Sequence, residues 1–172
     1  MKIRNLFALI TLSVTALIMT GCLDDGSLST VEYNNAVVEM LNDTSAAIED
    51  TTTVYDDSIP NIVTEETEVE TTEMQISYEA AKLQLETAYT VLDIISKNST
   101  QQEEVRAEFQ AYLDLGSDYI ETFETVLSYY GGSEFAENLD LVAEYDEGLH
   151  TGYNDFINSN NNLVDILADF IE

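Results

Sequence analysis

The sequence of residues 105–130, VRAEFQAYLDLGSDYIETFETVLSYY, determines the fold that we predict for this chain. Its large apolar residues, with one glycine among them, recur at alternating steps of four and three positions. Such spacing places an apolar stripe along one side of an α-helix and is typical of a helix that packs in a bundle. The residues of the series are Val105, Phe109, Tyr112, Gly116, Tyr119, Phe123, Val126 and Tyr130.

The same spacing occurs in three other parts of the chain. It is clear between residues 135 and 170 and between residues 74 and 95, and it is weaker between residues 33 and 54. The chain contains one proline and seven glycines, too few for the many turns of an all-β domain. We therefore predict four helices, at about residues 28–57, 72–97, 100–130 and 133–171.

Three connections separate the predicted helices. The first contains Pro60 and a stretch rich in threonine and glutamate, the second lies near Asn98, and the third contains Gly131 and Gly132. Short connections place neighbouring helices antiparallel. The prediction is an all-α, antiparallel up-down-up-down four-helix bundle with left-handed, coiled-coil-like packing, formed as one domain by residues 28–172.

The N-terminus has the layout of a secretory signal. Lys2 and Arg4 give a positive start, and residues 6–19 form an uncharged, largely apolar run that is shorter than the ~20 residues of a spanning helix. Met19-Thr20-Gly21-Cys22 follows, and Cys22 is the only cysteine. This stretch resembles the lipobox of prokaryotic lipoproteins. The resemblance implies a signal peptide at 1–21, cleavage before Cys22 and lipidation of the Cys22 sulfur.

Residues 22–27 would then form a short lipidated tether. At no more than ~3.5 Å per residue, this tether would hold the domain close to the membrane, outside the cytoplasm. The turn near Asn98 and the C-terminus would lie at the membrane end of the bundle. The glutamate-rich first connection and the turn at Gly131 would lie at the far tip.

The acidic residues limit the partners that we expect. Once Lys2 and Arg4 leave with the signal, three cations remain against 34 acidic residues, a formal net charge of −31. Nucleic acid and anionic lipid are poor partners for such a chain, because binding them depends on Lys and Arg. A divalent cation, or a cationic component or protein of the cell envelope, would suit it better. The alternative is a solubilising coat adapted to salty surroundings. Asn42 and Asn98 begin N-glycosylation sequons.

No catalytic motif is present, and we predict a protein that is not an enzyme and needs no cofactor. A di-iron bundle needs Glu-x-x-His twice, and the chain has it once, in Glu147-Gly148-Leu149-His150. Zinc sites built from cysteine and histidine are excluded because only one of each is present. Weak metal candidates remain in the first connection: Glu65, Glu66, Glu68, Glu70 and Glu73.

A polar pair interrupts the last apolar series. Asp146 occupies a position where every other residue except Asn160 is apolar, and His150, the only histidine, lies one helical turn further on. If the last two helices fold back on each other about Gly132, residue i of one faces roughly residue 264 minus i of the other.

This register predicts a polar layer in the middle of the bundle. Gly148 would lie opposite Gly116, and Asp146 and His150 would lie near Tyr119, at the height of alanines from the first two helices. One interpretation is a pocket for a small solute or a single cation. The other is a polar layer that only fixes the register of the helices.

Three functions from different classes follow. The first is a non-enzymatic, lipid-anchored surface module that binds or simply occupies the envelope, and exposed apolar patches would favour it. The second is a solute- or cation-binding bundle, which a cavity at Gly116 and Gly148 would favour. The third is a metal-handling enzyme of the ferritin type, which would need two inward carboxylate clusters and which the lone His150 disfavours.

Overall fold

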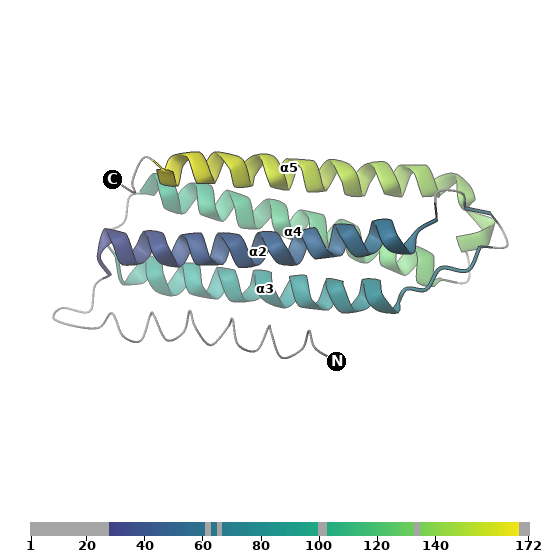
Figure 1. Cartoon of the computed structure of the whole chain (residues 1–172), viewed down its shortest axis with the longest axis horizontal. Helices are drawn as coiled ribbons and strands as arrows, with labels where there is room; N and C mark the ends of the chain where they lie inside the picture. Colours follow the sequence, from purple (N-terminus) through teal and green to yellow (C-terminus); the bar gives the residue numbers. More distant parts are fainter. Residues whose placement is uncertain (1–27, 61–62, 65–66, 100–102, 133–134, 169–172) are drawn as a thin grey trace.

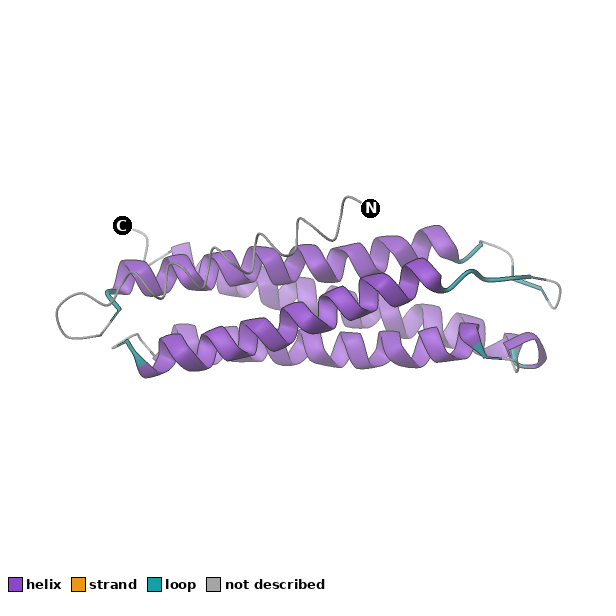
Figure 2. Cartoon of the chain, turned by 90° about the horizontal axis from the view of Figure 1, so that it is seen from below, coloured by secondary structure: helices purple, strands orange, loops and turns teal. Residues whose placement is uncertain are grey.

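The computed structural model describes residues 28–60, 63–64, 67–99, 103–132 and 135–168. The predicted signal peptide, the tether and Cys22 lie outside the described residues. Within the described ranges, helices connected by loops account for the fold (Figure 2). The long helices are α2 (Thr30–Ser58), α3 (Thr72–Lys97), α4 (Glu103–Gly131) and α5 (Val142–Ala168), and two 3-10 turns, η1 (Phe135–Glu137) and η2 (Leu139–Leu141), precede α5.

The helices form an up-down bundle in which consecutive helices are neighbours (Figure 1). α4 packs against both α3 and α5, whereas α2 packs closely against α3 and more sparsely against α5. The start of α2 lies at the same end as the α3–α4 connection, because the Leu28 N–H donates a hydrogen bond to the Asn98 carbonyl. The prediction of an all-α, up-down four-helix bundle is confirmed.

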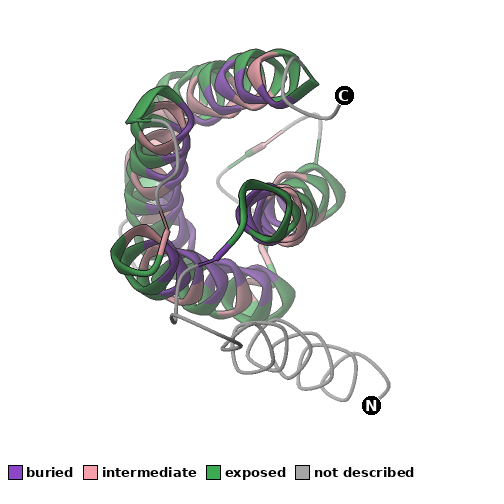
Figure 3. Ribbon diagram, turned by 90° about the vertical axis from the view of Figure 1, so that its left-hand side faces the viewer, coloured by how far each residue is buried: buried purple, intermediate pink, exposed green. Residues whose placement is uncertain are grey.

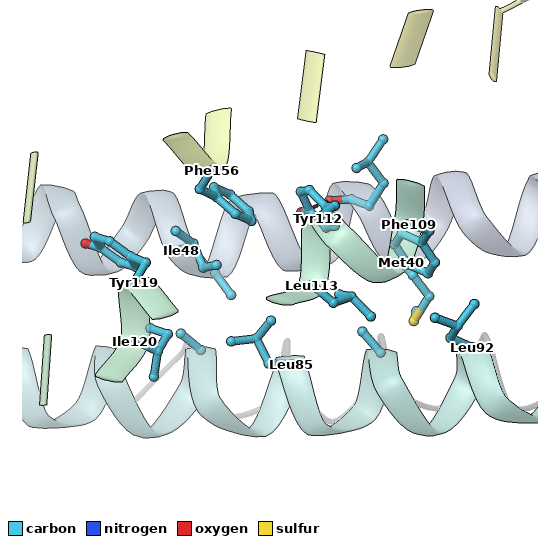
Figure 4. Packing of buried hydrophobic residues seen from close by; sticks show 14 of the residues in the cluster. Met40, Ile48, Leu85, Leu92, Phe109, Tyr112, Leu113, Tyr119, Ile120 and Phe156 are labelled. Atoms are coloured by element: carbon cyan, nitrogen blue, oxygen red, sulfur yellow. Dashed lines mark hydrogen bonds between the residues drawn. The ribbon is translucent and has the colours of Figure 1, made fainter. Parts of the chain in front are cut away.

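Most of the described residues in the predicted apolar series are buried in the core. Viewed along the bundle, the buried residues line the inner faces of the helices and the exposed residues lie outside (Figure 3). Near the middle, the Tyr112 ring packs on Phe156 with centroids 4.7 Å apart and on Phe109 at 5.9 Å (Figure 4). Burying one such aromatic side chain stabilises the fold by roughly 1.5–3 kcal/mol.

Two polar clusters inside the core are satisfied by hydrogen bonds between helices. The Tyr119 hydroxyl of α4 lies 3.1 Å from the Thr51 Oγ1 and 2.7 Å from the Thr52 Oγ1 of α2. Ser45 of α2 donates to the side-chain oxygen of Asn160 of α5 at 2.9 Å and lies 2.9 Å from the Tyr112 hydroxyl. Polar groups that bond between helices fix which residues face each other, and the bond from Ser45 accounts for the half-buried Asn160 in an apolar series.

The chain between α4 and α5 differs from the prediction, because α5 begins at Val142 and not near residue 133. Phe135 is buried against Tyr129 and Tyr130, with ring centroids 5.5 and 5.2 Å apart. The Tyr129 hydroxyl also donates to the Asn138 carbonyl at 2.8 Å. The segment therefore stays over the end of α4 in two 3-10 turns before α5 begins.

This longer connection makes the predicted register of the last two helices wrong. A Cβ on Gly116 would meet Phe156, one on Gly152 would meet Tyr119, and one on Gly148 would meet Thr122. The residue numbers of these facing pairs add up to 270–272 and not to about 264. For a given residue of α4, the facing residue of α5 is therefore about seven positions, or about two helical turns, later in the sequence than predicted. Gly148 therefore does not face Gly116, and Asp146 does not lie beside Tyr119.

Candidate functional site

A cleft of about 600 Å³ opens between the C-terminal end of α2 and the N-terminal end of α5. We call it the α2–α5 cleft. The two helix ends that border it lie at the end of the bundle away from the start of α2 (Figure 1). Its lining residues are Tyr55, Asp56, Ile59, Pro60, Val63, Leu139, Val142, Ala143, Asp146 and His150.

The cleft is open because the first turns of α5 stand away from the core. From Val142 to Gly148 no residue of α5 is buried, and the first buried side chain is Leu149. On the other side, α2 ends at Ser58, with Pro60 two residues further on, so the helix does not continue along α5. The space between these two ends is lined partly by apolar side chains that rest on the core: Ile59, Val63, Leu139 and Val142.

His150 joins the two sides of the α2–α5 cleft. Its Nε2 lies 3.4 Å from a carboxylate oxygen of Asp56 on α2, and its Nδ1 lies 3.5 Å from a carboxylate oxygen of Asp146 on α5. Nδ1 is also 2.8 Å from the backbone carbonyl oxygen of Asp146. All three side chains are about half exposed. The imidazole is therefore held between two carboxylates that different helices supply.

Tyr55 forms the buried wall of the cleft. Only 1% of this residue is exposed, and its hydroxyl donates to the Asp146 carboxylate over a long 3.4 Å. Burial, together with the neighbouring Tyr130 and Asp146, raises the pKa of Tyr55 far above its usual range. The phenol therefore stays neutral and keeps its proton as a hydrogen-bond donor. Its ring meets the edge of the His150 ring at a centroid distance of 6.3 Å.

The predicted site residues divide into two groups. Asp146 and His150 both line the α2–α5 cleft, but Asp146 is exposed there and does not lie in a buried layer in the middle of the bundle. Tyr119 is in the core with its hydroxyl bonded to α2, and Gly148 is exposed. Gly116 adjoins no cavity, because a Cβ there would lie 3.0 Å from Leu85, 3.1 Å from Ile48 and 3.3 Å from Phe156. The mid-bundle pocket that the sequence suggested is thus filled by side chains.

Sequence reasoning missed the contribution of α2 to this cleft. Tyr55 and Asp56 follow the weakest of the four apolar series and lie beyond its last residue, Val54. If the predicted pairing of the last two helices had allowed for a longer connection after Gly132, it would have placed Asp146 near the C-terminal end of α2. The sequence feature that indicated the longer connection was therefore Phe135, an apolar residue that packs on the core before α5 begins.

The described glutamates of the first connection, Glu68, Glu70 and Glu73, do not gather into a metal site. Glu70 accepts hydrogen bonds from the N–H and the hydroxyl of Thr72, whereas Glu68 and Glu73 are exposed, and Glu65 and Glu66 lie outside the described residues. Throughout the described ranges, no group of three or more His, Cys, Asp or Glu side chains is arranged to hold a metal ion.

A second candidate surface lies on the outer face of α3. Ile76, Leu83 and Ile94 are 59%, 60% and 37% exposed, and their spacing places them on one side of the helix. The positions between them on that side carry no charge, and together they form what we call the α3 stripe: Ile76, Ala80, Leu83, Thr87, Thr90 and Ile94. Along one edge of the stripe run three exposed acids, Glu79, Glu86 and Asp93.

Comparison with protein-family models, with curated proteins and with solved structures finds no match to this chain. None of the helices in the described residues combines the length and the hydropathy needed to cross a membrane. The α2–α5 cleft and the α3 stripe are the two candidate functional surfaces of the described residues.

Proposed function

We propose that this protein is a non-enzymatic lipoprotein, anchored outside the cytoplasm through Cys22, whose bundle binds a cationic protein partner through the α3 stripe. The observation that carries the proposal is the alignment of exposed Ile76, Leu83 and Ile94 along α3. Single exposed apolar residues are ordinary, but an aligned apolar row is typical of a docking surface.

The α3 stripe has the dimensions of a helix-binding surface. From Ile76 to Ile94 it extends ~27 Å at 1.5 Å per residue. The hydroxyls of Thr87 and Thr90 donate to backbone carbonyls of α3 itself, at 2.8 and 2.9 Å, so they need no outside partner. An amphipathic helix whose apolar face packed on this row would bury Ile76, Leu83 and Ile94 and would leave no polar group of the stripe without a hydrogen-bond partner.

The charges beside the stripe favour a basic partner. Glu79, Glu86 and Asp93 recur every seven residues along its edge, and of these Asp93 pairs with Lys97. A second copy of the chain would place like charges together, because every acidic residue in the described ranges is exposed or half exposed. A helix with a Leu-rich face flanked by Lys or Arg would meet both the apolar row and the acids.

The lipid anchor is tested by replacing Cys22. In cells of a bacterium that processes lipoproteins, the wild-type chain should incorporate labelled palmitate and sediment with membranes, whereas Cys22→Ser should do neither. Equal labelling and sedimentation of Cys22→Ser would overturn the anchor. That result would leave the bundle and the α3 stripe unaffected.

The docking surface is tested with a synthetic helix. The probe is a peptide with a leucine face flanked by lysines, and its matched control has glutamates in place of the lysines. At 150 mM salt we expect the double variant Ile76→Ser/Leu83→Ser to bind the lysine peptide at least about tenfold more weakly. Val164→Ser is the control, because Val164 is 45% exposed but lies on α5. Equal losses in both variants, or equal binding of the two peptides, would contradict the proposal.

A second candidate function is the binding of a small solute or cation. The observation that favours it is the α2–α5 cleft, which contains both Asp146 and His150. The two functions use different surfaces and can fail separately.

A further inference from the structure

We propose that the α2–α5 cleft binds a small organic cation, a protonated amine on a compact apolar body. This inference deepens the second candidate function and is independent of the α3 stripe. It depends on three features of the cleft: its size, its apolar floor, and the two carboxylates that face each other across His150.

The size and the floor fit a small molecule. A volume of about 600 Å³ falls within the ~300–1,000 Å³ of typical ligand sites. Ile59, Val63, Leu139 and Val142 line the cleft and are partly buried against the core. A ring or a branched alkyl group placed there would remove these side chains from water, which gives the apolar part of a ligand its affinity.

The carboxylates define the charge of the ligand. In the described part of the chain, Asp56 and Asp146 contact His150 at 3.4 and 3.5 Å, and neither carboxylate is paired with Lys or Arg. Two carboxylates beside an apolar floor repel anions and attract a cation. An ammonium group has three N–H donors and can satisfy oxygens on both sides of the cleft.

The position of His150 gives that ammonium group a specific place. Its Nδ1 is 2.8 Å from the Asp146 carbonyl oxygen, so Nδ1 carries a proton and donates it. In the neutral imidazole, Nε2 is then an acceptor that faces another acceptor, the Asp56 carboxylate, at 3.4 Å. An ammonium N–H that enters beside these two atoms would donate to both and relieve their repulsion.

A metal ion fits this cleft less well. Nδ1 of His150 is occupied by the Asp146 carbonyl, which leaves Nε2 as its ligand atom. In the described residues, the two carboxylates and His150 do not form a group arranged to hold a metal. The apolar floor would also have no role with a bare ion.

The experiment uses the lone histidine as its probe. In the full chain, purified in a non-ionic detergent and labelled with ¹³C at histidine, the Cε1–H group of the imidazole gives a single signal, that of His150, because the 172 residues contain one histidine. Cyclohexylamine, titrated at pH 7.5 and 150 mM salt, should move this signal along a saturable curve. Methylamine lacks the ring, cyclohexanol lacks the charge, and cyclohexanecarboxylate has the opposite charge. Each of the three should shift the signal at least about fivefold less than cyclohexylamine at equal concentration.

Variants separate a site from general attraction to the acidic chain. Asp56→Asn and Asp146→Asn should each weaken cyclohexylamine binding at least about fivefold, and Val142→Ser should weaken cyclohexylamine but not methylamine. Glu147→Gln is the matched control, since Glu147 is an exposed acid beside Asp146 that does not line the cleft. All four changes lie on half-exposed or exposed residues, and a far-ultraviolet circular dichroism melt checks that each variant folds.

Three results would overturn the proposal. They are a signal that does not saturate, a methylamine curve equal to that of cyclohexylamine, and a loss in Glu147→Gln equal to that in Asp56→Asn. None of them bears on the α3 stripe, whose peptide experiment uses a different face of the molecule.

Discussion

The imidazole of His150 on α5 lies 3.4 Å from the carboxylate of Asp56 on α2, so the chain's only histidine bridges the first and last helices of the described bundle. These two helices contact each other less than any two consecutive long helices do. The bridge therefore spans the least closely packed seam between neighbouring helices. It also places the polar part of the α2–α5 cleft against solvent, where a ligand could reach it.

The position of this bridge predicts that it contributes little to stability. Both side chains are about half exposed, and contacts between polar or charged groups that solvent reaches contribute roughly 0–1 kcal/mol. His150→Ala should change the free energy of unfolding by no more than about 1 kcal/mol. Urea denaturation followed by circular dichroism measures this, and a loss several times larger would show that the cleft residues hold the bundle together.

Two glycines should respond in opposite directions. Gly116 is enclosed by Leu85 and Ile48, so Gly116→Val should overpack the core and cost about 1–3 kcal/mol. A Cβ on Gly148 meets its nearest neighbour, Thr122, at 4.0 Å. Gly148→Ala should therefore stabilise α5 by about 0.5–1 kcal/mol through helix propensity. Denaturant midpoints measure both, and equal destabilisation by the two changes would favour the register in which Gly116 and Gly148 face each other.

The sequence predicts the helices of this protein better than their register. The period of the apolar residues gives the four helices because it depends only on local geometry, and the bounds of α3 agree with the prediction, residues 72–97. The start of α5 depends on a tertiary contact instead. Phe135 and Leu139 continue the apolar spacing, yet burial of Phe135 against Tyr129 keeps the chain out of the helix.

The same contact decides the candidate site. The spacing identified Asp146 and His150 as an unusual pair, since a polar residue in an apolar series is visible in the sequence alone. Their partners Tyr55 and Asp56 come from a helix distant in the sequence, and a shift of two turns changes which partners they meet. Cys22 and the first two glutamates of the connection, Glu65 and Glu66, lie outside the described residues and stay predictions.

Removing one buried hydroxyl should test the polar cluster between α2, α4 and α5. The Tyr112 hydroxyl donates to the Leu41 carbonyl at 3.1 Å and lies 2.9 Å from Ser45. Tyr112→Phe should cost about 1–3 kcal/mol, because it leaves a buried carbonyl with fewer partners. Tyr153→Phe is a suitable control, since Tyr153 is only half buried. Urea melts of the two variants should differ, and equal stabilities would show that the cluster is not coupled to folding.

Buried tyrosines should make the fold sensitive to alkali. Burial raises the pKa of Tyr55, Tyr112 and Tyr119, and for Tyr89 it raises the pKa to about 12. The folded state therefore binds these protons more tightly than the unfolded state, whose tyrosines titrate near ~10. The resulting stability is complete below about pH 10 and is lost as the pH rises towards the folded-state values. Tyrosinate absorbance and circular dichroism are recorded together, and the absorbance of the buried tyrosines should rise in the same step as unfolding. Ionisation of all ten tyrosines before the circular dichroism changes would contradict the burial.

Salt should stabilise the bundle by screening, whichever cation supplies it. The chain carries a formal net charge of −29, and a Debye length of ~30 Å at 0.01 M falls to ~3 Å at 1 M. The melting temperature should therefore rise with sodium chloride, and the chain should be only marginally folded at the lowest ionic strength. Calcium and magnesium at matched ionic strength should have about the same effect, since the described residues contain no grouped metal ligands. A melting temperature independent of salt would contradict the role of charge.

A large extra shift of the melting temperature from micromolar calcium would reveal a cation site. The variants Glu68→Gln/Glu70→Gln and Asp56→Asn would then show whether that site lies in the first connection or in the α2–α5 cleft.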